Sequence, residues 1–284
     1  MNPIIIVLAA FIPSAVLVHH FYRQDKRKSE PIDRILKLFF LGMVLVVLVL
    51  IPEEILGSVF SESITDLVVF SFFNAFVVAA LCEETAKLVL VRTYIYNDPH
   101  FDEISDGIFY TIVASLGFAC AENILYIFNY GIEVIQIRAL FAVPLHASAS
   151  GIMGYYIGKA KFSKSKIEER NYFIKGLCLA IGIHGFYNFI FTTVPSMFSF
   201  FINIVVLVSA FRFLYNKINV ALLEDEINEN NIAVSISQSP TNKPNPSQTM
   251  HPSLQKEIDN IVEKKKSKEE TKERVYKKGD LYKE

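Results

Sequence analysis

The stretch 82-CEETAKLVLVR-92 places two adjacent glutamates, Glu83 and Glu84, and a lysine, Lys87, inside a long apolar run. The run covers residues 67–94, which is longer than the roughly 20 residues that a helix needs to cross the hydrocarbon core of a membrane. An ionisable side chain at the centre of such a helix costs about 2.5–3.5 kcal/mol on insertion scales. Charges at this position therefore indicate a function or a partner inside the membrane.

The whole chain has the composition of a membrane protein. Hydrophobic residues make up 52% of its 284 residues, and Phe, Leu, Ile and Val occur in long runs. The sequence predicts an all-α, polytopic transmembrane helix bundle, a multi-pass protein of the cell membrane with about seven spans. The predicted spans are approximately 3–22, 36–56, 67–94, 108–130, 139–158, 173–193 and 197–215.

The connections between these spans predict the orientation of the chain, because Lys and Arg accumulate on the cytoplasmic side of a membrane. Connections 23–35 and 159–172 are rich in Lys and Arg, whereas 57–66 and 194–196 contain neither and 131–138 contains only Arg138. This alternation predicts an N-terminus outside the cell and a C-terminus in the cytoplasm. The basic cluster follows the first apolar run, so we interpret that run as a retained anchor.

The composition changes after the last predicted span. From about residue 218 the chain becomes polar and then charge-dense, ending in "EKKKSKEETKERVYKKGDLYKE". A segment of this kind buries too little apolar surface to fold on its own. We therefore predict a transmembrane domain over 1–217 and a disordered cytoplasmic tail over 218–284. The lipid bilayer is an expected partner, and no nucleic-acid partner is expected.

Polar side chains occur near the middle of four predicted spans. A helix rises 1.5 Å per residue, which puts Glu83, Glu122, His146 and His184 within about two turns of the middle of their spans. They are therefore expected to meet in one layer, with Asn188 on the same helix face as His184. Small residues near them would allow close helix packing: Gly117, Ala119, Ala147, Ser148, Gly151, Gly154, Gly182 and Gly185.

A second glutamate pair occurs at Glu53 and Glu54, directly after Pro52. These two residues fall at the outer end of the second predicted span, where water is available to solvate them. We predict no catalytic role for this pair.

Carboxylates and imidazoles in a cavity of low dielectric constant can activate water, and either Glu83 or Glu84 suits a general base. In a metal-dependent version, His146, His184 and a carboxylate, assigned as Glu122, hold Zn²⁺ while another Glu deprotonates the water. In a metal-free version, a Glu activates water directly, and His184 and Asn188 donate hydrogen bonds to the oxyanion. The sequence leaves both versions open, and it contains no HExxH motif.

Four motifs resemble those of one family. "EETAK" at 83–87, "FACAEN" at 118–123, His146, and "HGFYN" at 184–188 are similar to the motifs of the PrsW family of intramembrane proteases. That family is itself similar to the CAAX prenyl protease and bacteriocin-processing superfamily. The resemblance covers about residues 1–215, which would make 1–217 the protease domain. The catalytic residues that it implies are Glu83, Glu84, Glu122, His146, His184 and Asn188.

The resemblance implies an intramembrane endopeptidase, of metallo or glutamate type, whose substrate is a single-pass membrane protein. For PrsW itself the implied substrate is an anti-sigma factor cut on its extracytoplasmic side. Other members of the superfamily remove C-terminal tripeptides from prenylated proteins or act in peptide-toxin immunity and maturation.

Two alternatives stay open at this point. A proton- or ion-coupled transporter would also carry Glu and His at mid-membrane, although the chain shows no internal repeat and no pair of broken helices. A non-catalytic membrane immunity or scaffold protein would use the same polar residues only to hold helices together.

Overall fold

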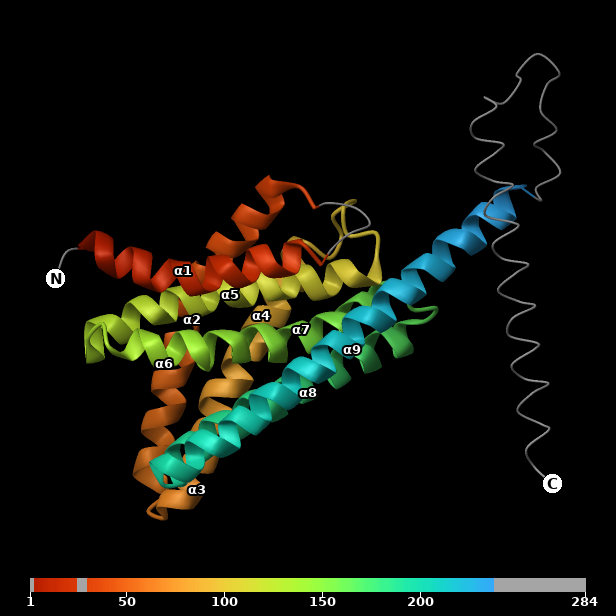
Figure 1. Ribbon diagram of the computed structural model, residues 1–284. Helices are drawn as coiled ribbons and strands as arrows, with labels where there is room; N and C mark the ends of the chain where they lie inside the picture. Colours follow the sequence, from red (N-terminus) through yellow and green to blue (C-terminus); the bar gives the residue numbers. More distant parts are fainter. Residues whose placement is uncertain (1–2, 25–29, 238–284) are drawn as a thin grey trace, which may run out of the picture. The chain divides into compact units, whose positions relative to one another are not determined.

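The computed structural model describes residues 3–24 and 30–237, and every regular element among them is a helix (Figure 1). The all-α prediction is thus confirmed for the described part of the chain. In chain order the helices are α1 Pro3–Tyr22, α2 Ile32–Ser63, α3 Leu67–Phe73, η1 Asn74–Leu81, α4 Cys82–Tyr94, α5 Ile104–Tyr130, α6 Val134–Leu140, α7 Ala142–Lys161, α8 Lys166–Thr193 and α9 Ser196–Ser237.

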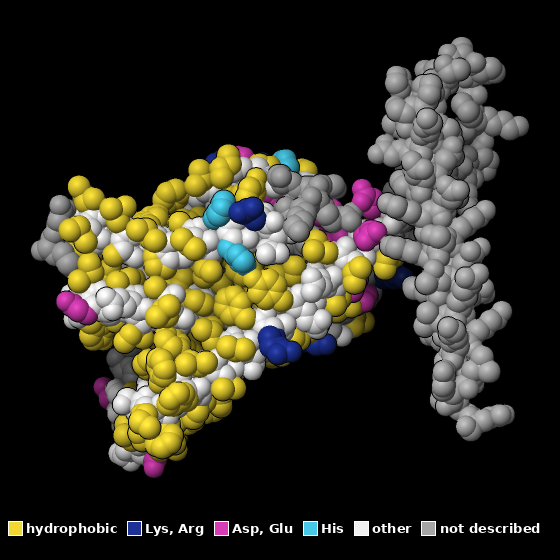
Figure 2. Space-filling view, viewed as in Figure 1, with side chains coloured by type: hydrophobic (Ala, Val, Ile, Leu, Met, Phe, Trp, Pro, Cys, Tyr) yellow, Lys and Arg dark blue, Asp and Glu magenta, His cyan; other side chains and the backbone are white. Residues whose placement is uncertain are grey.

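Within the described residues, six helices or continuous helical runs are long and apolar enough to cross a membrane. They are Ile4–Tyr22, Ile32–Ser63, Leu67–Tyr94, Ile104–Tyr130, Lys166–Thr193 and Ser196–Asn230. Hydrophobic side chains cover most of the visible face of the bundle (Figure 2), as expected for a surface that contacts lipid. The chain is therefore a multi-pass membrane protein.

Most of the remaining predicted span, 139–158, lies in α7, which is not among these six helices. Nearly all residues of α7 are buried among the other helices, including His146, Ser148 and Ser150. A helix that contacts protein instead of lipid does not need an apolar surface, so it can carry small and polar residues. This explains why hydropathy separates α7 from the lipid-facing helices.

The centre of the bundle is the pair α5 and α7, which lie side by side (Figure 1). The pair is antiparallel: Gly154 of α7 contacts Gly107 near the start of α5, whereas His146 lies beside Ser115 further along α5. Helices α1 and α2 pack on α5, and α8 packs on α7 and on η1. This arrangement encloses the middle of α5 and α7, where the predicted polar residues lie.

Glycines allow the closest of these contacts. A Cβ atom on Gly117 would lie 2.0 Å from the backbone oxygen of Phe39, and one on Gly42 would lie 2.1 Å from that of Ala114. The α2–α5 crossing therefore depends on the absence of side chains at both positions. The prediction that Gly117 serves close packing is confirmed. The same prediction for Gly182 is wrong, because no atom lies within 4 Å of a Cβ built there.

Connections that the sequence predicts on one side of the membrane meet at one end of the bundle. Arg34 Nε lies 2.9 Å from Asp98 Oδ2, and Lys161 Nζ donates a hydrogen bond of 2.5 Å to the backbone oxygen of Tyr96. These contacts join the segments around residues 34, 97 and 161. They agree with the predicted alternation, while the assignment of this end to the cytoplasm stays a prediction.

The last helix also contributes to this end. Asp225 of α9 accepts hydrogen bonds from Ile104 N at 2.7 Å and from Ser105 N at 3.0 Å. It thereby satisfies two of the backbone donors that a helix leaves unpaired at its N-terminus, here the N-terminus of α5.

The described chain up to Glu229 forms one compact unit. Helix α9 continues past residue 217 to Ser237, so it is longer than the last predicted span, 197–215. The prediction of a disordered tail over 218–284 falls mainly on residues outside the described part of the chain, so the boundary at 217 stays a prediction.

Candidate functional site

The helical run that carries the EETAK motif changes its geometry just before the motif. Residues Asn74–Leu81 form the π-helix η1, and α4 begins at Cys82, so Glu83 and Glu84 lie in its first turn. A π-helix has wider turns than an α-helix and therefore rotates the residues that follow, and such segments are frequent at functional sites. The apolar sequence of this segment has no Gly or Pro that would have predicted the change.

Contact between η1 and α8 depends on one glycine. A Cβ atom on Gly185 would lie 2.4 Å from the ring of Phe76, so the ring rests directly against the α8 backbone. Gly185 follows His184 in the chain. This contact fixes the start of the EETAK motif relative to the histidine of α8.

Lys87 lies at the centre of the polar cluster. Its Nζ atom is 2.8 Å from Glu84 Oε1, 3.1 Å from Glu83 Oε2 and 3.1 Å from His146 Nδ1. The side chain is 0% exposed, and its ammonium lies 4.5 Å from the centre of the Phe118 ring. A buried charge needs partners of opposite sign, and here two carboxylates supply them. Lys87 thus compensates part of the negative charge of the paired acids.

His146 connects Lys87 to Glu122. Its Nε2 atom lies 2.8 Å from Glu122 Oε2, on the opposite side of the ring from Lys87. Arg138 of α6 lies 3.2 Å from the same carboxylate oxygen and donates a hydrogen bond of 2.7 Å to Asn123 Oδ1. Arg138 is buried and thus holds both polar residues of the FACAEN motif.

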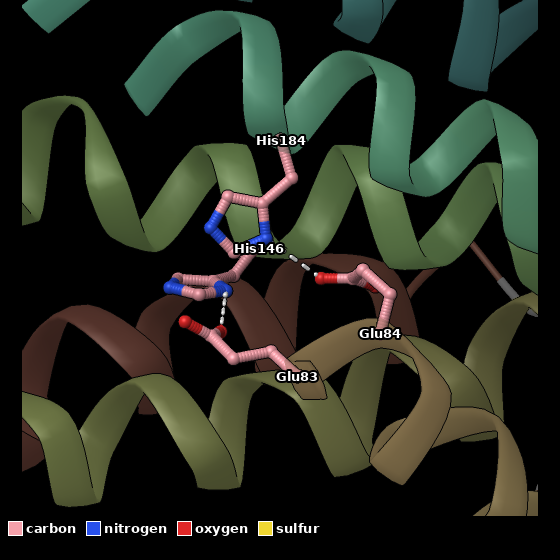
Figure 3. Close-up of side chains that lie close together, drawn as sticks. All are labelled: Glu83, Glu84, His146 and His184. Atoms are coloured by element: carbon pink, nitrogen blue, oxygen red, sulfur yellow. Dashed lines mark hydrogen bonds and ion pairs between the residues drawn. The ribbon is translucent and has the colours of Figure 1, made fainter. Parts of the chain in front are cut away.

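His184 binds the second glutamate of the pair. Its Nδ1 atom lies 3.0 Å from Glu84 Oε1, and Ser150 donates a hydrogen bond of 2.7 Å to Glu84 Oε2. The rings of His146 and His184 meet edge to face, with centroids 5.0 Å apart. Figure 3 shows the two glutamates of α4 and the two histidines of α7 and α8 converging on one point. Both oxygens of Glu84 are engaged, and the residue is 0% exposed.

A cavity of about 600 Å³ reaches this cluster from between α2, η1, α5, α6 and α8. Glu83, Glu122, His146, His184 and Asn188 all line it, whereas Glu84 lies behind its wall. A cavity of this size, with a few convergent polar groups, is typical of a ligand site. The expectation that the four motifs meet around a shared pocket is confirmed.

Sequence reasoning missed several residues of this site. Arg138 carries no signal in the sequence except that it is the one basic residue of its connection, and Ser150 lies in a run of small residues that indicates only packing. Glu53 also lines the cavity, although the sequence places it at a water-exposed helix end. Helix α2 continues to Ser63, which sets Glu53 inside the bundle instead of at its edge.

The match to known proteins agrees with the motifs. Residues 30–214 match the family model described as "PrsW family intramembrane metalloprotease". This chain belongs to the PrsW family. It is therefore an intramembrane protease. The transporter and scaffold alternatives are rejected.

Curated relatives of this PrsW-family chain are similar over most of their length. It is 37% identical over 195 residues to Protease PrsW of Bacillus subtilis (strain 168), covering 67% of this chain and 84% of the relative. It is 40% identical over 190 residues to Protease PrsW of Oceanobacillus iheyensis, covering 65% and 82%, and 34% identical over 189 residues to that of Clostridioides difficile (strain 630), covering 64% and 77%. No solved structure matches the chain significantly.

The PrsW family is described as a family of metalloproteases, so we asked which residues of this chain could bind a metal ion. Glu83, Glu84, His146 and His184 each offer a ligand atom, and these atoms lie within 4.8 Å of one another. Imidazoles and carboxylates are the ligands that Zn²⁺ takes in catalytic sites, so the residues fit this ion by type and spacing. Lys87 Nζ contacts three of the four residues, so an ion bound there would displace the ammonium from its position.

Glu122, which the sequence assigned as a metal ligand, is outside this group in the PrsW-family structure. It contacts the Nε2 atom of His146, while the Nδ1 atom of the same ring faces the cluster. Histidines that bind a metal through one ring nitrogen commonly donate the other N–H to a carboxylate. Glu122 has the position of such an orienting carboxylate.

Proposed function

We propose that this PrsW-family protease hydrolyses a peptide bond of a single-pass membrane protein in the 600 Å³ cavity, with Glu83 as the general base that activates water. The observation that carries the proposal is the difference between the paired glutamates. Glu83 lines the cavity, where water and substrate can enter, whereas Glu84 is enclosed by Lys87, Ser150 and His184. Of the two bases that suit the sequence, only Glu83 has access to the reacting groups.

The other residues receive roles from their contacts. Lys87 and Glu84 hold Glu83, His146 and His184 in one arrangement, and Arg138 and Glu122 orient His146. His184 and Asn188 line the cavity one helical turn apart and can donate hydrogen bonds to the oxyanion of the attacked carbonyl. In the metal-dependent version, Glu84, His146 and His184 would instead hold zinc in place of the Lys87 ammonium, and the ion would polarise a carbonyl and lower the pKa of a bound water.

The substrate that we propose is an anti-sigma factor cut on its extracytoplasmic side. The cavity is lined by Thr192 near the end of α8 and by Tyr130 at the end of α5. Both helix ends precede connections that are poor in basic residues, which the sequence predicts outside the cell. A cleavage site close to the outer membrane surface would suit a cavity that opens toward this end.

The test is co-expression of the chain with tagged single-pass membrane proteins, an anti-sigma factor among them. Fragments should appear with the unaltered protein and disappear with Glu83→Gln. Glu54→Gln is the matched control, because Glu54 is an exposed glutamate of α2 that does not line the cavity. Fragments that persist in the Glu83→Gln variant, with normal folding of that variant, would contradict the assignment of the base.

A further inference from the structure

Glu53 differs from every other carboxylate of the cavity in having no partner. Glu122 is paired with Arg138, and Glu83 shares Lys87 with Glu84. Glu53 lines the same cavity, yet no hydrogen bond or ion pair joins its carboxylate to any residue in the described part of the chain. A carboxylate inside a membrane bundle is costly without a partner, so the missing partner requires an explanation.

The cavity as a whole has an excess of negative charge. Glu53, Glu83 and Glu122 line it and Glu84 lies behind them, against two cations among the described residues, Lys87 and Arg138. With the four carboxylates counted as ionised and the imidazoles as neutral, the formal charge of this group is −2 in a partly enclosed space. A cavity with one dominant sign of charge and walls of low dielectric constant attracts ligands of the opposite sign.

The wall next to Glu53 suits a long basic side chain in shape as well as charge. Val46 and Leu50 precede Glu53 by seven and three residues on α2, and all three line the cavity, so they form one helix face. Lysine and arginine pack their methylene stems on apolar surface and bring only the charged end to a polar group. Val46 and Leu50 offer that apolar surface, and Glu53 offers the acid at its end.

We propose that Glu53 determines substrate specificity by binding a Lys or Arg side chain of the substrate close to the bond that is cut. The inference rests on the proposed function, because it assumes that substrate occupies this cavity. The volume of about 600 Å³ is sufficient for one long side chain together with a short stretch of backbone. The substrate class is therefore a membrane-anchored protein with a basic residue beside its cleavage site.

The experiment measures cleavage of a reporter set by the purified full-length protein in lipid vesicles. The reporters share one transmembrane segment and carry Lys, Met or Glu in turn at each position flanking the cleaved bond. At one position, Lys should be preferred over Met by about tenfold or more, as expected for a charge-assisted hydrogen bond. Glu53→Gln should remove this preference, and Glu53→Lys should make the Glu reporter the better substrate.

Two matched variants, Glu54→Gln and Glu54→Lys, alter the neighbouring exposed glutamate and should leave the preference unchanged. Thermal unfolding of each Glu53 variant shows whether it is folded. If Glu53→Lys does not fold, Glu53→Gln, which keeps the size of the side chain, still tests the inference. Cleavage that depends on Glu83 but shows no charge preference, or a preference that survives Glu53→Gln, would overturn this inference alone. The absence of any Glu83-dependent cleavage would overturn the proposed function as well.

Discussion

Glu83 and Glu84 are adjacent in the chain, but only Glu83 lines the cavity, while Glu84 binds His184 at 3.0 Å from behind the cavity wall. Successive residues of a helix point about 100° apart, so adjacent carboxylates face different surroundings. One acid is available to substrate, and the other joins three helices through Lys87, Ser150 and His184. Substitutions at the two positions should therefore fail in different ways.

Glu83→Gln should lower the rate of hydrolysis by about 10²–10⁴-fold, the usual contribution of a general base, with little change in stability. Glu84→Ala should instead lower the free energy of unfolding by roughly 3–5 kcal/mol, because it removes the closer of the two carboxylates that pair with buried Lys87 and also leaves Ser150 and His184 without their common partner. Denaturant unfolding in micelles, together with a cleavage assay, separates the two effects. Equal stability of the Glu83→Ala and Glu84→Ala variants would contradict the division of roles.

The amount of bound metal should fall further when a histidine ligand is removed than when Glu122, which orients His146, is changed. We expect zinc in the purified protein, its loss in His184→Ala, and a metal affinity reduced by about 10–100-fold in Glu122→Gln, where the ring loses its orienting carboxylate. Elemental analysis after dialysis measures this directly, with Glu54→Gln as the control. Full activity of a metal-free preparation in the presence of a chelator would favour the metal-free version of the chemistry.

The π-helix η1 should be necessary for activity but not for membrane insertion. Deletion of Val77 shortens the wide segment Asn74–Leu81 by one residue and favours an ordinary α-helix there. The residues that follow would then be rotated relative to α8, and a displacement of about 1 Å in a catalytic group can cost about 10²-fold in rate. The cleavage assay should show this loss while the amount of protein in the membrane stays normal. Retained activity would mean that the wide turn does not position the motif.

The crossing of α2 and α5 should not tolerate a side chain at Gly117. Gly117→Ala places a Cβ atom against the Phe39 backbone, which cannot move aside as a flexible side chain could, and should cost about 1–3 kcal/mol. Gly182→Ala is the matched control, because space is open there. Unfolding in micelles should show a loss for the first variant and no loss for the second. A similar stability for both would contradict the close contact.

Hydropathy predicted the helices that face lipid better than it predicted their extensions. The stretch 3–22 has the same ends as α1, and 67–94 has the same ends as the run from α3 to α4, because lipid requires apolar residues there. Helix α2 continues to Ser63 and α9 to Ser237, beyond the stretches that the sequence marked. Residues 57–63 and 218–237 contain more polar residues than the apolar stretches before them, so hydropathy alone did not predict that the helices continue through them.

Depth along each span was enough to predict that Glu83, Glu122, His146 and His184 meet. It could not assign the contacts of each atom, since the rotation of a helix about its axis depends on its packing. Arg138 shows this limit most clearly. It lies in a short helix outside the predicted spans and returns to Glu122, sixteen residues earlier in the chain, through a contact that only the tertiary fold creates.

Asp225, near the end of α9, accepts hydrogen bonds from Ile104 and Ser105 in the first turn of α5. Helix α9 therefore stabilises the helix that carries Glu122. A chain cut back to residue 217 would keep every residue that lines the cavity, yet it would lose the last part of the apolar run Ser196–Asn230 and the two hydrogen bonds at the first turn of α5. Helix α9 thus stabilises the N-terminus of α5, and its truncation should make α5, the helix that carries Glu122, less rigid.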